Sequence, residues 1–201
     1  MDSSQAVEHF LQRHPPTHTR PVPEARAAAY QDILPDELPA LWRTAGWGKY
    51  GGGLIELIDP ADYQDVLNGW LGADRTGTRT PFLLSAFGVL YYWRRLGEVQ
   101  PDGRYEGYDV AYINPHDSDT GVVAWDAATF LGEYLGADEL TYDLDPFDLW
   151  LTLQSRAATE LGSGMIYGFV PALRLGGEPD PLTAAPVQAP EHLELLRQLA
   201  E

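Results

Sequence analysis

Hydrophobic residues recur at helical spacing in the first third of the chain. The pattern predicts helices over residues 3–13, 24–33 and 36–45, and Gly46 ends the third of them. The clearest apolar stripe follows Asp59-Pro60, a pair typical of a helix N-terminus. Its members recur at i, i+3, i+4, i+7 and i+8, and they are Tyr63, Val66, Leu67, Trp70 and Leu71. Gly72 is expected to end this helix.

Three further helices are predicted in the second half of the chain. Asp126 is expected to cap a helix that Gly136 ends, and Asp145-Pro146 to begin a second that continues to Leu161. The last helix covers residues 191–200, where leucines recur on one side.

Alternating or continuous apolar runs predict strands between these helices. The strands are expected at residues 54–58, 80–87, 89–95 and 165–170, with a hairpin formed by residues 106–114 and 121–125. Residues 14–23 contain four prolines and predict an extended linker, while residues 46–51 and 176–190 are interpreted as loops.

The composition restricts the possible partners. The 201 residues include 13 Lys plus Arg and 30 Asp plus Glu, so the net charge is −17. Such a chain is repelled by nucleic-acid phosphates and by anionic membranes. A hydrophobic content of 44% with 11% aromatic residues excludes a disordered acidic chain. With no cysteine, no signal-peptide pattern and no long apolar run, we expect a soluble cytoplasmic protein.

The sequence contains no convincing catalytic, cofactor or metal motif. Gly46–Gly51 matches G-x-G-x-x-G, but a helix precedes it and a strand follows, the reverse of a dinucleotide site. Ser163 lies between glycines in a predicted helix-to-strand turn, which is not a nucleophile elbow. Residues 117–121 resemble the start of a calcium loop whose twelfth position is Ala128 instead of Glu. A hydrolase using His116 with Asp117 or Asp119 remains an alternative.

The negative charge is concentrated in residues 105–155. This segment has eleven acidic residues and no Lys or Arg, and it also contains several Tyr and Trp residues. A solvated acidic face is one interpretation, with Asp126 and Asp145 acting only as helix caps. Aromatic residues among carboxylates favour a binding face for a cationic protein. The candidate partner contacts are Asp117, Asp119, Asp138, Glu139, Tyr142, Asp143 and Asp148.

Two groups of residues resemble known families. Residues 34–48, the run Gly52–Pro60 and Ala86-Phe87-Gly88 resemble a GAD-like domain. Residues 165–173 (Met-Ile-Tyr-Gly-Phe-Val-Pro-Ala-Leu), with Leu175-Gly176-Gly177, resemble the C-terminal domain of type VI secretion DNase immunity proteins. Together they resemble two-part immunity proteins of the SMI1/KNR4-like group. The resemblance implies an α+β fold with a mixed or antiparallel sheet covered by helices.

The resemblance also implies a function and a division of the chain. A GAD-like part over residues 1–104 and an immunity-protein part over residues 105–201 are expected to pack as one unit. Such a protein binds and neutralises a cognate toxin, commonly a nuclease, without catalysis and without a cofactor. The acidic segment would then cover the cationic surface on which the toxin holds DNA. A general SMI1/KNR4-like interaction module with no role in immunity is the alternative.

Overall fold

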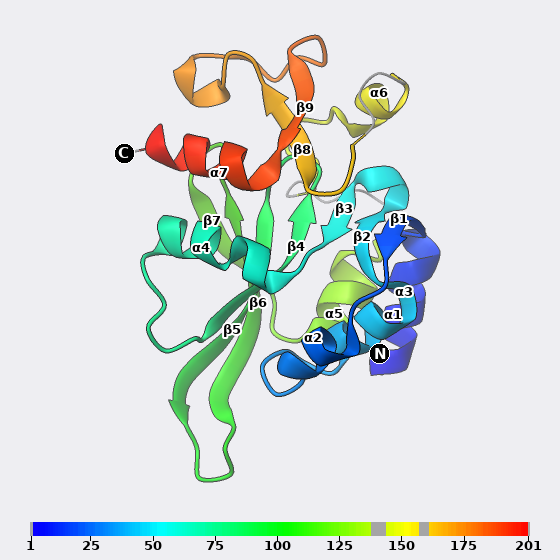
Figure 1. Ribbon diagram of the computed structural model, residues 1–201, viewed down its shortest axis with the longest axis vertical. Coiled ribbons are helices and arrows are strands. Elements are labelled where there is room, and N and C mark those ends of the chain that lie inside the picture. The colour runs from blue at the N-terminus through cyan, green and yellow to red at the C-terminus, as the bar shows by residue number, and fades with distance from the viewer. Residues whose placement is uncertain (1, 138–143, 157–160, 201) are drawn as a thin grey trace.

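A seven-stranded antiparallel sheet organises the protein (Figure 1). The computed structural model describes residues 2–137, 144–156 and 161–200. Each strand pairs with the next one along the chain, so the sheet is a meander. The strands are β1 (Pro16–Arg20), β2 (Trp47–Tyr50), β3 (Ile55–Leu57), β4 (Arg79–Ser85), β5 (Leu90–Val99), β6 (Tyr105–Asn114) and β7 (Asp119–Ala124).

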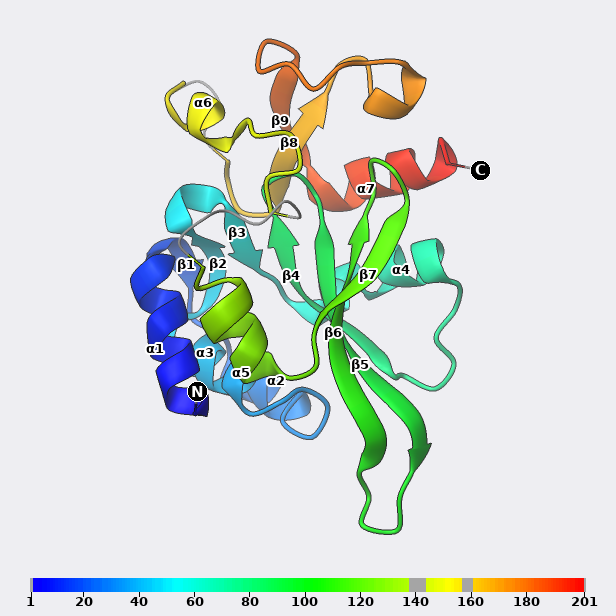
Figure 2. The same ribbon diagram turned by 180° about the vertical axis from the view of Figure 1, so that it is seen from behind.

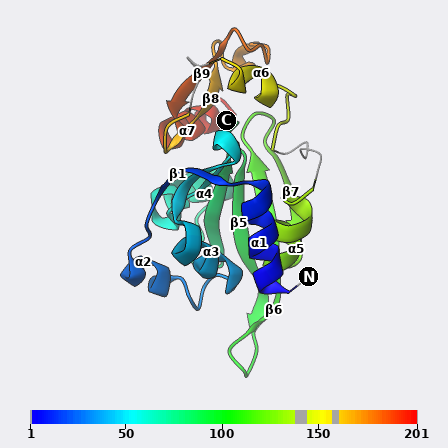
Figure 3. The ribbon, with the colours of Figure 1, turned by 90° about the vertical axis from the view of Figure 1, so that its right-hand side faces the viewer.

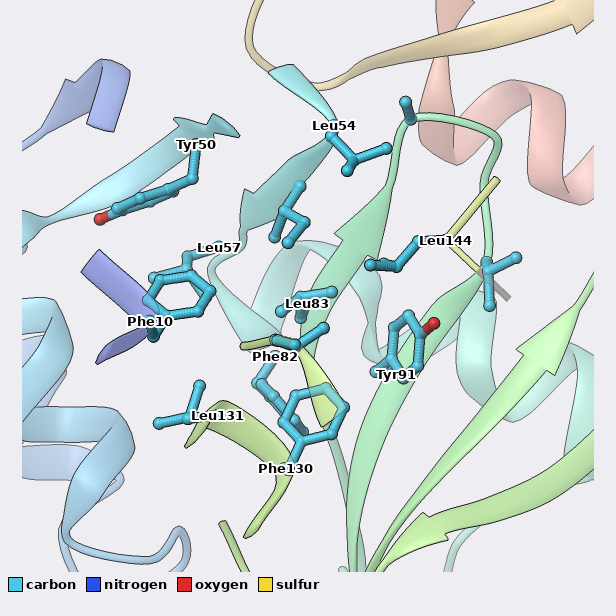
Figure 4. Packing of buried hydrophobic residues seen from close by; sticks show 14 of the residues in the cluster. Phe10, Tyr50, Leu54, Leu57, Phe82, Leu83, Tyr91, Phe130, Leu131 and Leu144 are labelled. Atoms are coloured by element: carbon cyan, nitrogen blue, oxygen red, sulfur yellow. The ribbon is translucent and has the colours of Figure 1, made fainter. Parts of the chain in front are cut away.

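Several helical elements cover one face of this sheet. They are α1 (Ser3–Arg13), α3 (Glu37–Ala45), α5 (Ala127–Thr129) and a π-helical turn, η2 (Phe130–Tyr134). The short helix α2 (Glu24–Ala29) packs against α3. Phe10 of α1, Phe82 and Tyr91 of the sheet and Phe130 of η2 meet in the larger hydrophobic core (Figure 4). Burial of these large rings fixes the helices on the sheet.

The opposite face carries α4 (Pro60–Leu71) and α7 (Ala189–Gln198). Figure 3 shows α4 on one side of the sheet and α1 with α5 on the other. Leu67 and Leu193 from the two helices pack against Leu90 and Ile113 in a second hydrophobic core. Central strands must therefore be apolar on both faces, as β5 is at Leu90–Trp93.

The C-terminal part adds a small sheet of two antiparallel strands, β8 (Met165–Phe169) and β9 (Ala184–Gln188). A short helix α6 (Trp150–Gln154) precedes it, and the single turns η1 (Gly51–Gly53) and η4 (Leu173–Leu175) complete the described elements. The amide of Tyr167 donates to the carbonyl of Ala86 at 2.8 Å, which joins β8 to the turn between β4 and β5.

Most of the predicted helix boundaries are confirmed. The helix predicted at 3–13 has those bounds, and Asp59 caps α4 by accepting from the amide of Ala61. The helix predicted at 24–33 ends earlier, at Ala29. The helix expected after Asp145 begins only at Trp150, because Asp148 adopts a positive φ of 53° and no helix can continue through it.

Three strands were not predicted. The presumed linker contributes β1, the presumed glycine loop contributes β2, and the loop expected at 176–190 contains β9. The sheet is antiparallel throughout, which confirms the predicted α+β class. The β5–β6 hairpin crosses residue 104 and extends away from the rest of the molecule (Figure 2). A division at residue 104 stays a prediction.

Candidate partner-binding surface

The β6–β7 turn presents two of the predicted contacts, Asp117 and Asp119, and both are exposed. Asp117 accepts from the side-chain amide of Asn114 at 3.2 Å and from the backbone amide of Asp119 at 2.9 Å. Asp119 accepts from the hydroxyl of Tyr112 at 2.7 Å. The carboxylates therefore shape the turn and still face solvent, where a partner can reach them.

A cation from the C-terminal part lies against the same turn. Arg174 donates to the carbonyl of Pro115 at 3.0 Å and to the hydroxyl of Ser118, and its guanidinium lies 5.7 Å from the ring centre of Trp70. The turn is thus less negative than its own sequence indicates.

Asp109 does not contribute to the expected acidic surface. Its side chain is buried and forms a two-point ion pair with Arg94, with nitrogen–oxygen distances of 2.8 and 2.6 Å. Asp126 caps α5 through the amide of Thr129 at 2.7 Å, and Asp145 accepts from the amides of Leu149 and Trp150. These three carboxylates have structural roles. Asp126 is the helix cap that was predicted, whereas the N-cap position of α6 is Leu149 and not Asp145.

Asp148, a third predicted contact, is exposed just before α6. Its neighbour Phe147 packs on His116, with ring centres 5.1 Å apart, so the segment before α6 meets the segment before the β6–β7 turn. The remaining predicted contacts, Asp138, Glu139, Tyr142 and Asp143, lie outside the described residues.

His116 is part of an aromatic packing cluster. Its ring contacts Phe147 and Phe169, and its Nε2 lies 2.8 Å from the carbonyl oxygen of Phe87. Burial lowers the pKa of His116 to about 4, so the ring is neutral at pH 7. Asp117 and Asp119 use their carboxylates within the turn instead of orienting this ring. The contacts of His116 are those of a packed side chain, not of a base placed beside a nucleophile.

A second polar cluster joins the two halves of the chain. Lys49, the only lysine, lies 2.7 Å from Glu56 and also donates to the carbonyl of Met165 at 2.7 Å. Glu56 accepts from Ser163 at 2.9 Å and from the amide of Gly164 at 2.8 Å. Burial lowers the pKa of Lys49, and the adjacent Glu56 opposes that effect. Ser163 thus serves as a hydrogen-bond donor to a structural carboxylate.

A groove was missed by sequence reasoning. It has a volume of about 600 Å³ and lies between the loop after α2, the outer part of the β5–β6 hairpin and the start of α5. Tyr105, Tyr108 and Trp125 line it, together with carboxylates from residues 32–37. The aromatic residues are visible as members of the acidic segment, but nothing in the sequence places the carboxylates of Asp32 and Asp36 beside them.

In residues 2–137, 144–156 and 161–200, no group of three or more His, Asp or Glu side chains is arranged to hold a metal ion. No helix of the described chain has the length and apolar character of a membrane span.

The protein has a mixed α+β fold, in which an antiparallel meander carries helices on both faces and a small two-stranded sheet is added. Its surface carries acidic and aromatic residues. Residues 5–99 match the GAD-like domain, and residues 149–200 match the C-terminal domain of T6SS immunity protein Tdi1. These two matches confirm both resemblances that the sequence motifs indicated.

The fold also occurs in a solved structure. The chain is similar to the crystal structure of Atu4351 from Agrobacterium tumefaciens, with a TM-score of 0.75 and 20% identity, over 96% of this chain and 88% of that chain. At this identity the likeness shows the fold. Comparison with curated protein sequences gave no match.

Proposed function

We propose that this protein is an immunity protein that binds and neutralises a cognate toxin delivered by a type VI secretion system. The observation that supports this most directly is the match of residues 149–200 to the C-terminal domain of T6SS immunity protein Tdi1. Neutralisation proceeds by binding, without catalysis by this chain. The packed environment of His116 is in keeping with that role.

The toxin is a nuclease in this proposal. A nuclease that holds DNA needs a cationic surface, and a protein of charge −17 is electrostatically complementary to it. Three of the proposed toxin contacts lie among the described residues and are exposed, namely Asp117, Asp119 and Asp148. Asp138, Glu139, Tyr142 and Asp143 complete the proposed set from outside those residues.

The test is protection and binding with the toxin encoded by the adjacent gene. Cells that produce the toxin should survive when this protein is co-expressed, and the two proteins should co-purify. DNA cleavage by the purified toxin should stop at one equivalent of this protein. The nuclease assignment fails if the toxin leaves DNA intact while still killing cells.

Charge reversal tests the acidic face. Asp117→Lys with Asp119→Lys should weaken toxin binding at least tenfold, because two favourable charges become repulsive. A matched control, Asp65→Lys with Glu191→Lys, makes the same change in net charge at exposed sites on α4 and α7. Equal affinity of both variants would contradict the acidic-face mechanism. Binding of other proteins without any protection would favour the general interaction module.

A further inference from the structure

The groove beside the β5–β6 hairpin has aromatic walls. Trp93 and Tyr108 are stacked with their ring centres 5.5 Å apart, and Tyr105 packs edge-on against Tyr108 at 6.5 Å. The guanidinium of Arg95 lies 4.9 Å from the ring centre of Tyr105. These contacts hold the rings in place, so the groove is preformed.

Trp125 stands at the edge of this groove and is unusually exposed. Its exposed fraction is 70%, whereas Trp42, Trp47, Trp93 and Trp150 are all buried. It directly follows β7 and precedes Asp126, which caps α5, so its backbone is fixed between two regular elements. A rigidly placed, solvent-exposed Trp beside a cavity is typical of the residues that dominate protein interfaces.

Carboxylates also line the groove. They belong to Asp32, Asp36, Glu37 and Asp126, and the guanidinium groups of Arg95 and Arg104 lie in the same lining. Glu37 accepts from Ser3 and Asp126 caps α5, so both have local structural roles. Asp36 stands at the N-cap position of α3, yet its side chain forms no capping hydrogen bond and is exposed. Its carboxylate is therefore available to a partner.

A groove lined by both an exposed Trp and an uncommitted carboxylate fits a guanidinium. The planar cation stacks on an indole face and also donates two hydrogen bonds to a carboxylate, which an ammonium cannot do in the same way. The excess of carboxylates over guanidinium groups favours a cationic occupant.

The groove and the acidic β6–β7 turn lie along one face of β6. Tyr108 at the groove and Tyr112, which binds Asp119, both pack at the edge of the larger core, while Ala111 and Ile113 point to the other core. Residues four apart on a strand are separated by about 13 Å. A single partner of ordinary interface size can therefore contact both places.

We infer that this groove receives an arginine side chain of the toxin, which stacks on Trp125 and pairs with Asp36. The inference rests on the proposed function, because it assigns the anchor point of the same partner. Trp125 and Asp36 then determine affinity and specificity, and the carboxylates of the β6–β7 turn act mainly on the rate of encounter.

The experiment measures the affinity of purified variants for the toxin encoded by the adjacent gene. Trp125→Ala and Asp36→Lys should each weaken binding at least tenfold, and Trp125→Phe should retain most of it. Leu182→Ala is the matched control, since Leu182 is 79% exposed and lies in the C-terminal part, away from the groove residues. Circular dichroism and urea unfolding show that each variant is folded.

The outcomes separate the two proposals. If the wild-type protein binds the toxin and the variants Trp125→Ala and Asp36→Lys bind it equally tightly, the proposed role of the groove is overturned. The proposed immunity function is unaffected by that result. Loss of binding in Leu182→Ala to the same degree also overturns the groove as the anchor. Absence of wild-type binding overturns the proposed function and the groove together.

Discussion

Lys49 and Glu56 form a buried ion pair, with Nζ 2.7 Å from Oε2, that connects the seven-stranded sheet to the strand β8. The two residues face each other across β2 and β3, and both side chains are almost fully buried. Ser163, Gly164 and Met165 supply the remaining hydrogen-bond partners. The pair therefore fixes how the residues matched to the Tdi1 domain sit on those matched to the GAD-like domain.

Removing one partner of this pair should be costly. Lys49→Met leaves the Glu56 carboxylate buried without its cation, and breaking a buried pair in this way costs about 3–5 kcal/mol. Urea unfolding measures the loss as a lower midpoint with an unchanged slope.

The double variant Lys49→Met with Glu56→Gln is the control. It removes both charges, while the Gln oxygen can still accept from the amide of Gly164, so part of the lost stability should return. A double variant no more stable than Lys49→Met would show that packing, not the buried charge, is responsible.

Gly48 allows β1 to pair with β2. Its φ is 131°, and a Cβ there would lie 2.1 Å from the carbonyl oxygen of His18, which is backbone and cannot move aside. Gly48→Ala should therefore detach β1, with accelerated hydrogen exchange of the amides of residues 16–20.

Gly72→Ala provides the comparison for that variant. Gly72 also has a positive φ, 80°, but a Cβ there meets nothing within 4 Å. Only the conformational strain of a backbone with φ 80° and ψ 158° remains, about 1–3 kcal/mol. If both substitutions have the same cost and leave β1 protected, the steric explanation for Gly48 is wrong.

Local signals in the sequence were sufficient for the helices. The caps at Asp59 and Asp126 depend on neighbouring residues only, so they can be read from a short window. The strands β1, β2 and β9 have no such signal. Every residue of β1 is exposed, β2 contains Gly48 at positive φ, and β9 includes Pro186, so pairing with a distant segment defines them.

The candidate site shows the same limit. Asp117 and Asp119 could be predicted as an exposed acidic turn because they are adjacent in sequence. The groove brings Asp36 together with Tyr108 and Trp125, which are more than 70 residues away along the chain. Only the packing of the loop after α2 against the sheet places them together. Arg174, which lies beside the acidic turn, was unpredictable for the same reason.

His116 should make stability depend on pH. Burial lowers its folded-state pKa to about 4, well below the ordinary value near 6.5. Between these values the unfolded chain binds a proton that the folded protein does not, so the free energy of unfolding falls as the pH falls from 6.5 towards 4. Above pH 6.5 the stability from this residue is complete, and the full loss is about 3 kcal/mol.

The pH effect can be isolated by substitution. His116→Leu should flatten the dependence of the unfolding free energy between pH 6.5 and 4, and His18→Gln on the exposed strand β1 should not. His192, which lies near His116, and His14 also have pKa values lowered by burial, so some dependence should persist in His116→Leu. An unaltered slope in His116→Leu would rule out this residue as a source.

The acidic turn and the groove should act on different rate constants of toxin binding. If the β6–β7 turn accelerates encounter, the association rate should fall about tenfold as ionic strength rises from about 0.05 to 0.5 M, because salt screens exposed charges. Asp117→Lys with Asp119→Lys should reduce this salt dependence.

Trp125→Ala changes no charge, so it should leave the salt dependence intact and raise the dissociation rate instead. Stopped-flow measurements give the association rate constant, and surface-based measurements give the dissociation rate constant. A Trp125→Ala variant in which only the association rate constant changes would contradict the role of Trp125 as an anchor.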